Sequence, residues 1–159
     1  MVFLRNFENQ TYYNFNLMRS VLTVVFTMWL FTSCKKDNSG IIPESYVNVS
    51  LYVSDPQFSQ LNAVGGFIYY NNGSSSGYRG LIIYKRGVND YVAYERACTY
   101  DPESTCGGMT VGTDNFTIKD ECCGSKFQIY DGSVSQGPAS YPMVAYRTQF
   151  DGVVLNITN

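Results

Sequence analysis

The sequence predicts an all-β fold, and the prediction rests on its aromatic content, its strand-like runs and its lack of a sustained helical period. Fourteen Tyr and ten Phe occur among 159 residues, and aromatic side chains favour the half-buried, pleated surface of a sheet. No segment after Gly40 repeats apolar residues at helical spacing. Short strands separated by turns every few residues are typical of an all-β sandwich or barrel.

The first expected strand covers residues 46–53, where apolar and polar side chains alternate. Residues 57–64 are expected to form a short turn or irregular segment, and "NNGSSSG" at 71–77 is a turn of Gly, Asn and Ser. The other expected strands are residues 65–70, 81–86, 91–96, 116–119, 126–130, 143–149 and 153–157. We find no internal repeat and predict a single β domain.

Composition and charge exclude several classes of function. The formal net charge is −2 and no basic cluster follows the amino-terminal segment, so we expect no nucleic-acid partner. The chain contains no histidine, which removes Ser-His and Cys-His nucleophile pairs. Acidic side chains near the cysteines could act in acid–base chemistry, but loop acids are usually solvated, and we therefore expect a protein that is not an enzyme.

The segment from Met18, "MRSVLTVVFTMWLFTSC", has the pattern of an export signal. Arg19 provides the positive start, and the apolar run Val21–Phe31 is too short to span a bilayer as a helix. Its end, Phe31-Thr32-Ser33-Cys34, resembles the lipobox of bacterial lipoproteins, in which the cysteine becomes the lipidated first residue. A secretory signal followed by an unrelated cysteine is the alternative.

These features predict the domain organisation and the location. Residues 1–33 form the signal peptide, with Met18 as the expected start; residues 34–45 are the lipidated Cys34 and a flexible tether; residues 46–159 are the β domain. Acyl chains such as palmitate on Cys34 would hold the protein in a membrane of the cell envelope, facing the periplasm or the cell exterior. The membrane is the expected partner; no protein or ligand partner is predicted.

Four cysteines remain in the domain once Cys34 is lipidated: Cys98, Cys106, Cys122 and Cys123. An even number of cysteines in an exported domain predicts disulfides, and four cysteines allow three pairings. A bond between the adjacent Cys122 and Cys123 would need a strained ring. The residues alone leave the other two pairings open.

The stretches "YVAYERACTYDPESTC" and "DECCGSKFQIYDGSVSQGPASYPM" resemble the two cluster-binding boxes and the proline loop of the Rieske iron–sulfur domain. The family carries C-x-H-x-G-C in the first box and C-P-x-H-G-S-x-F in the second. The resemblance covers residues 46–159 and implies a Rieske-like stack of small antiparallel β-sheets, with the signal segment and tether outside the fold.

The resemblance also places four ligand positions of a [2Fe–2S] cluster. They fall on Cys98, Tyr100, Asp120 and Cys123. In a Rieske centre two Cys hold one iron and two His hold the other, so the motifs are degenerate and we expect no cofactor and no metal at this set of positions.

The family's disulfide between the two boxes falls on Cys106 and Cys122, and the remaining Cys98 and Cys123 are then expected to form a second bridge. The pairs Cys98–Cys122 and Cys106–Cys123 stay open as an alternative. We expect an envelope lipoprotein with a structural or binding role, whose loops are joined by two disulfides. The alternative is a metal-binding or electron-transfer protein that uses all four cysteines. A thiol–disulfide exchanger ranks last, because no C-x-x-C begins a helix.

Overall fold

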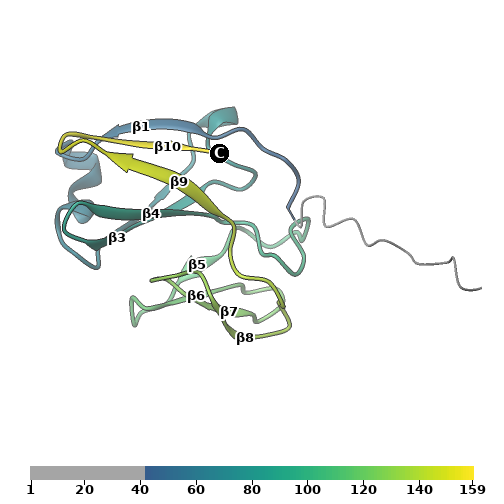
Figure 1. Cartoon of the computed structure of the whole chain (residues 1–159). Helices are drawn as coiled ribbons and strands as arrows, with labels where there is room; N and C mark the ends of the chain where they lie inside the picture. The colour runs from purple at the N-terminus through teal and green to yellow at the C-terminus, as the bar shows by residue number, and fades with distance from the viewer. Residues whose placement is uncertain (1–41) are drawn as a thin grey trace, which may run out of the picture. The chain divides into compact units, whose positions relative to one another are not determined.

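The computed structural model describes residues 42–159, which belong to one compact unit and contain two antiparallel sheets (Figure 1). The predicted signal peptide, Cys34 and most of the tether lie outside the described residues. In chain order the elements are β1 (Asn48–Tyr52), the 3₁₀ helix η1 (Pro56–Asn62), β2 (Phe67–Tyr70), the 3₁₀ helix η2 (Gly73–Ser75), β3 (Leu81–Gly87), β4 (Asp90–Glu95), β5 (Thr110–Val111), β6 (Thr117–Lys119), β7 (Lys126–Gln128), β8 (Val134–Gln136), β9 (Ala145–Phe150) and β10 (Val154–Thr158).

Helical structure within residues 42–159 is confined to η1 and η2, so the all-β prediction is confirmed. Asp55 begins η1 by accepting a hydrogen bond from the backbone N–H of Gln57, and Leu61 of this helix is buried in the core. The expected irregular segment at 57–64 is therefore largely a short helix. No helix in this range is long and apolar enough to cross a membrane.

The larger sheet has six strands in the order β1-β10-β9-β4-β3-β2, and all its pairings are antiparallel. The strands of its β1–β10 edge alternate buried and exposed side chains, with Val49 and Leu51 of β1 facing inward. Elsewhere in this sheet, β3 and β4 are buried on both faces over most of their length. Leu81 and Ile83 belong to one apolar cluster, and Ile82 and Tyr84 belong to the other.

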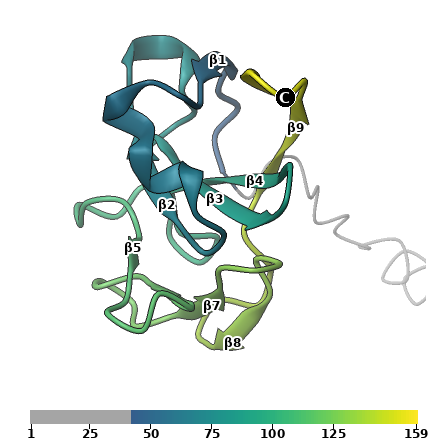
Figure 2. The ribbon, with the colours of Figure 1, turned by 90° about the vertical axis from the view of Figure 1, so that its left-hand side faces the viewer.

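The smaller sheet has four strands in the order β5-β6-β7-β8 and lies beside the β3–β4 face of the larger sheet (Figure 2). Ile118 of β6 and Phe127 of β7 are fully buried and pack in the same apolar cluster as Ile82 and Tyr94. Strands β5 and β8 were not predicted from the sequence. Both are very short edge strands, and their backbone pairing to β6 and β7 forms them rather than any alternation of their own.

Candidate functional site

Three loops that adjoin strands of the small sheet are bonded to one another and contain the residues singled out from the sequence. We call residues 97–109 cysteine loop 1, residues 120–125 cysteine loop 2 and residues 137–143 the proline loop. Cysteine loop 1 follows β4, cysteine loop 2 connects β6 to β7, and the proline loop connects β8 to β9.

A disulfide between Cys106 and Cys122 joins the two cysteine loops, with the two Cα atoms 5.7 Å apart. This confirms the bridge predicted between the two boxes. Because these two sulfurs are bonded to each other, they are not available as metal ligands. The alternative metal site of all four cysteines is therefore not supported by this structure.

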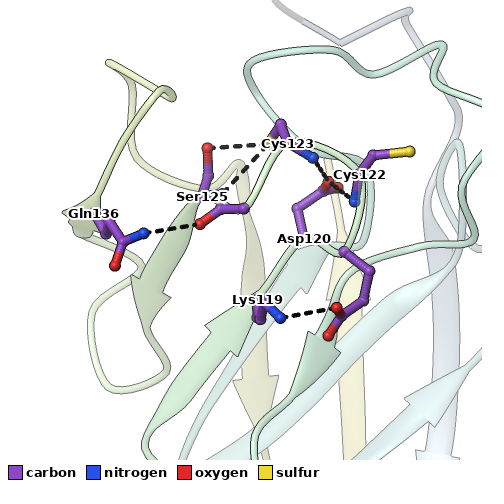
Figure 3. Close-up of polar contacts among 8 residues, drawn as sticks. Lys119, Asp120, Cys122, Cys123, Ser125 and Gln136 are labelled. Carbon is purple, nitrogen blue, oxygen red and sulfur yellow. Dashed lines mark hydrogen bonds and ion pairs between the residues drawn. The ribbon is translucent and has the colours of Figure 1, made fainter.

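The carboxylate of Asp120 organises cysteine loop 2 (Figure 3). Its Oδ1 accepts hydrogen bonds from the backbone N–H groups of Cys122 at 2.8 Å and Cys123 at 2.9 Å. The carbonyl of Asp120 accepts from the N–H of Gly124, whose φ of +76° lies in the left-handed region that glycine adopts without strain. Asp120 is 3% exposed, so it is a buried structural acid and not a solvated loop residue.

The thiols of Cys98 and Cys123 lie next to each other, with their sulfurs 3.6 Å apart. A carboxylate oxygen of Asp120 completes the group, and the three donor atoms all lie within 4.8 Å of one another. The predicted pairing of Cys98 with Cys123 thus corresponds to a direct contact, but both thiols are free in the structure and the second disulfide is not formed.

Burial raises the pKa of the Cys98 thiol to about 11, and the neighbouring Cys123 and the negative charge of Asp120 add to the effect, against a backbone hydrogen bond at Tyr100 that lowers it. Cys98 is therefore a protonated thiol at neutral pH when no metal is bound. A protonated thiol is a poor nucleophile, which argues against a function in thiol–disulfide exchange.

Ser125 connects cysteine loop 2 to the proline loop. Its Oγ accepts a hydrogen bond from the backbone N–H of Ala139 at 2.9 Å and from the thiol of Cys123 at 3.0 Å. The hydroxyl of Thr99 donates to the carbonyl of Tyr141 at 2.8 Å and links cysteine loop 1 to the proline loop. Each of the three loops is thus bonded to the other two.

Two charged residues outside the predicted site hold cysteine loop 1 in place. Glu95 at the end of β4 is fully buried, and its carboxylate accepts hydrogen bonds from three backbone N–H groups and from the hydroxyl of Tyr146. One of those N–H groups belongs to Arg79, whose guanidinium donates to the carbonyls of Pro102, Ser104 and Cys106. Arg79 lies outside the quoted motifs. Glu95 lies in the stretch that resembles the first box but not at a ligand position, so the sequence contains no signal for the role of either residue.

The remaining predicted positions face solvent. The side chain of Tyr100 is 57% exposed, so of the four degenerate ligand positions only Cys98, Asp120 and Cys123 are gathered in the interior. The neighbouring acids Asp101, Glu103 and Glu121 are exposed. Glu121 forms an ion pair with Lys119 at 2.8 Å.

No protein-family model matches the chain, and no curated protein matches it by sequence. Among solved structures the chain is similar to the cyanobacterial plasma membrane Rieske protein PetC3 from Synechocystis PCC 6803. The TM-score is 0.51 at 21% sequence identity, and the match covers 70% of this chain and 99% of that chain. The domain has a Rieske-like fold. At this level of identity the likeness establishes the Rieske-like fold alone, which is the fold that the sequence predicted.

Proposed function

We propose that the protein is a lipid-anchored envelope protein whose Rieske-like domain holds no [2Fe–2S] cluster and has a structural or binding role, not a catalytic one. The observation that supports this most directly is the set of donors at the four ligand positions. Those positions are Cys98, Tyr100, Asp120 and Cys123, and the chain has no imidazole to offer.

The donors present do not fit a Rieske centre. Such a centre needs two His on one iron and two Cys on the other, and by the family resemblance Cys98 and Cys123 stand at positions that hold different irons. Their sulfurs are 3.6 Å apart, which is direct contact, and a two-iron centre does not fit between them. Asp120 offers a carboxylate where the family has a Cys thiolate, and Tyr100 faces solvent.

The contacts that order the loops support a fold that needs no cluster. The Cys106–Cys122 disulfide joins the cysteine loops, Asp120 closes cysteine loop 2, and Arg79 fixes the carbonyls of cysteine loop 1. A disulfide that closes a loop of this size stabilises a small domain by about 3 kcal/mol. These interactions can supply the order that cluster ligation supplies in an iron–sulfur protein.

The membrane anchor is proposed from the signal pattern and the lipobox-like Phe31–Cys34. The similar solved structure is named as a plasma membrane protein, which is consistent with a membrane-associated location for this chain. We expect Cys34→Ser to move the protein from the membrane fraction to the soluble fraction. Cys98→Ser is the matched control, because it removes a cysteine without removing the anchor. Equal membrane association of all three proteins would contradict a lipid anchor at Cys34.

The cluster proposal is tested on the full chain, purified anaerobically from membranes in detergent. We expect no visible iron–sulfur absorption and no acid-labile sulfide, both as purified and after incubation with iron, sulfide and a thiol reductant. Visible charge-transfer bands together with stoichiometric iron and sulfide would refute the proposal. If such bands were found, their loss in Cys98→Ser would place the cluster at this site.

A further inference from the structure

Stabilisation of the loops does not explain why the possible metal ligands Cys98, Asp120 and Cys123 lie so close together. The Cys98 thiol from cysteine loop 1 meets the Cys123 thiol and the Asp120 carboxylate from cysteine loop 2, and the three donor atoms lie within 4.8 Å of one another. Cys98 and Asp120 are each 3% exposed, whereas Cys123 is half-buried and leaves an approach from solvent. We propose that these three side chains bind a single divalent metal ion of borderline-soft character, for which Zn²⁺ is the best match.

The distances suit one tetrahedral ion. Zinc–sulfur bonds are about 2.3 Å, so two sulfurs on one tetrahedral zinc are separated by about 3.8 Å. The observed separation of Cys98 Sγ and Cys123 Sγ is 3.6 Å. Two thiolates and one carboxylate oxygen match the ligand types of zinc, and a water molecule from the solvent side can fill the fourth position.

The surroundings orient the donors as second-shell contacts orient metal ligands. Asp120 Oδ1 accepts both backbone hydrogen bonds, which leaves Oδ2 without a hydrogen-bond partner among residues 42–159. The backbone N–H of Ser125 donates to the sulfur of Cys123 at 3.4 Å. On the other side, Cys98 packs in the apolar cluster that contains Met109 and Met143, which excludes water from its sulfur.

Asp120 favours the metal ion over a simple disulfide as the function of this group. A bond between Cys98 and Cys123 gains nothing from a carboxylate beside it. Two backbone N–H groups compensate Oδ1 of Asp120, and a cation would compensate Oδ2, which has no hydrogen-bond partner among residues 42–159. A divalent ion uses all three groups. On binding, each thiol releases its proton, so M²⁺, two thiols and one carboxylate give a complex of net charge −1 and two protons.

The inference rests on the proposed absence of a cluster, and Co²⁺ serves as the spectroscopic probe for the test. The full chain is purified anaerobically in detergent with a mild reductant, freed of metal with a chelator and titrated with Co²⁺. We expect a single Co²⁺ per chain, an intense sulfur-to-cobalt absorption band and tetrahedral ligand-field bands. Zn²⁺ should abolish these bands and raise the midpoint of thermal unfolding, because it binds the folded state.

The variants separate ligands from neighbours. Cys98→Ser and Cys123→Ser should abolish the sulfur-to-cobalt band, and Asp120→Asn should weaken binding about tenfold or more. Glu121→Gln is the matched control, since it alters the adjacent but exposed carboxylate, and it should bind as the unaltered chain does. Far-ultraviolet circular dichroism checks that each variant is folded. If a cysteine variant fails to fold, a second measurement on the unaltered chain takes its place. Bound Zn²⁺ should then protect Cys98 and Cys123 from an alkylating reagent.

The outcomes distinguish this inference from the proposed function. Failure of Co²⁺ and Zn²⁺ to bind the reduced chain, or unchanged binding in Asp120→Asn, would overturn the metal site and leave the cluster-free domain standing. Peptide mapping that finds Cys98 linked to Cys123 in the anaerobically purified chain, with no metal bound after its reduction, would also overturn it. Iron and labile sulfide in the purified protein would instead overturn the proposed function.

Discussion

The β3–β4 hairpin of the six-stranded sheet and the three loops that contain the candidate site are stabilised by different kinds of interaction. Strands β3 and β4 place fully buried side chains such as Ile82, Ile83 and Tyr94 on both of their faces. The loops are held instead by the Cys106–Cys122 disulfide and by polar contacts to Asp120 and Ser125. Apolar burial is non-directional and is shared among many atoms, whereas the loop contacts depend on a few polar atoms in specific directions.

Because of this difference, the chemistry of the loops can change while the sheets stay the same. Removing a single buried methylene costs about 0.8 kcal/mol in the apolar layers, and many neighbours share the effect. A single carboxylate or sulfur in the loops has no such substitute. We therefore expect conditions that break the loop contacts to open residues 97–109 and 120–125 before the β3–β4 hairpin.

Substitution of Glu95, which lies where the two regions join, should cause the largest loss of free energy of unfolding. Its buried carboxylate accepts four hydrogen bonds, from backbone N–H groups and from Tyr146. Glu95→Ala leaves these donors unpaired in the interior and should lower the free energy of unfolding by about 3–5 kcal/mol. Denaturant unfolding measures this, and Glu121→Ala, which removes an exposed carboxylate, should change it by less than about 0.5 kcal/mol. Equal effects of the two variants would show that the Glu95 contacts do not matter.

Removal of the disulfide should have the next largest effect. Replacing Cys106 and Cys122 together by Ala should cost about 3 kcal/mol, because the open loop gains conformational entropy in the unfolded state. Hydrogen exchange should accelerate first in cysteine loops 1 and 2 and least in β3 and β4. Uniform acceleration across both regions would mean that the loops and the sheets open as one unit.

Arg79 tests whether side-chain donors alone can order cysteine loop 1. Arg79→Ala removes the hydrogen bonds to the carbonyls of Pro102, Ser104 and Cys106 and should cost about 2 kcal/mol. The control is Arg86→Ala, whose exposed ion pair with Asp90 should be worth less than about 1 kcal/mol. Thermal or denaturant unfolding compares the two, and a larger loss in the control would reverse our assignment.

Ser125 tests the contact between cysteine loop 2 and the proline loop. Ser125→Ala leaves the N–H of Ala139 without its acceptor and should cost about 1 kcal/mol. Ser133→Ala removes an exposed hydroxyl that bonds only to Asp131 and should be nearly neutral. Hydrogen exchange at the Ala139 amide should rise in the first variant and stay unchanged in the second.

The smallest change in stability is expected from substitution of two turn aspartates, Asp114 and Asp151, and it should appear only at acidic pH. Hydrogen bonds from Thr117 lower the pKa of Asp114, and backbone N–H groups of the β9–β10 turn lower the pKa of Asp151. A lowered folded-state pKa gives stability that is present above the unfolded pKa of about 4 and is lost as the pH falls through the folded value. Asp114→Asn and Asp151→Asn should therefore each make the decline in stability below about pH 4 shallower. An unchanged acid limb in both variants would contradict these two pKa shifts.

The sheets were largely predictable because most of their strands show an apolar or alternating pattern within their own few residues. The run Leu81–Tyr84 and the alternation in residues 46–53 indicate strands without reference to the rest of the chain, and β3 and β1 are where they were expected. The edge strands β5 and β8 were missed because their pairing partners define them. The Cys106–Cys122 bridge followed from the resemblance to the Rieske boxes, not from spacing.

The site was predictable only in part because its geometry depends on contacts between distant segments. The sequence placed Cys98 and Cys123 together, and the structure has them in contact, but the predicted bond is absent. The burial of Asp120 was missed, since an acid in a Gly-Ser-containing loop has the pattern of a solvated residue. Glu95 and Arg79 were missed because most of their partners are backbone groups of distant residues, which no sequence pattern displays.

The Cys106–Cys122 bridge also decides what a cut in the chain would do. It closes a ring that contains β5 and β6, and Phe116, in the turn between these strands, is 67% exposed. A protease that cleaves after Phe116 would divide the chain into two fragments, which the Cys106–Cys122 disulfide would still hold together. The nicked protein should migrate as one species on a denaturing gel without reductant and as two with it. The last two strands, β9 and β10, would remain tied to the half that contains β1 and β4, with which they pair.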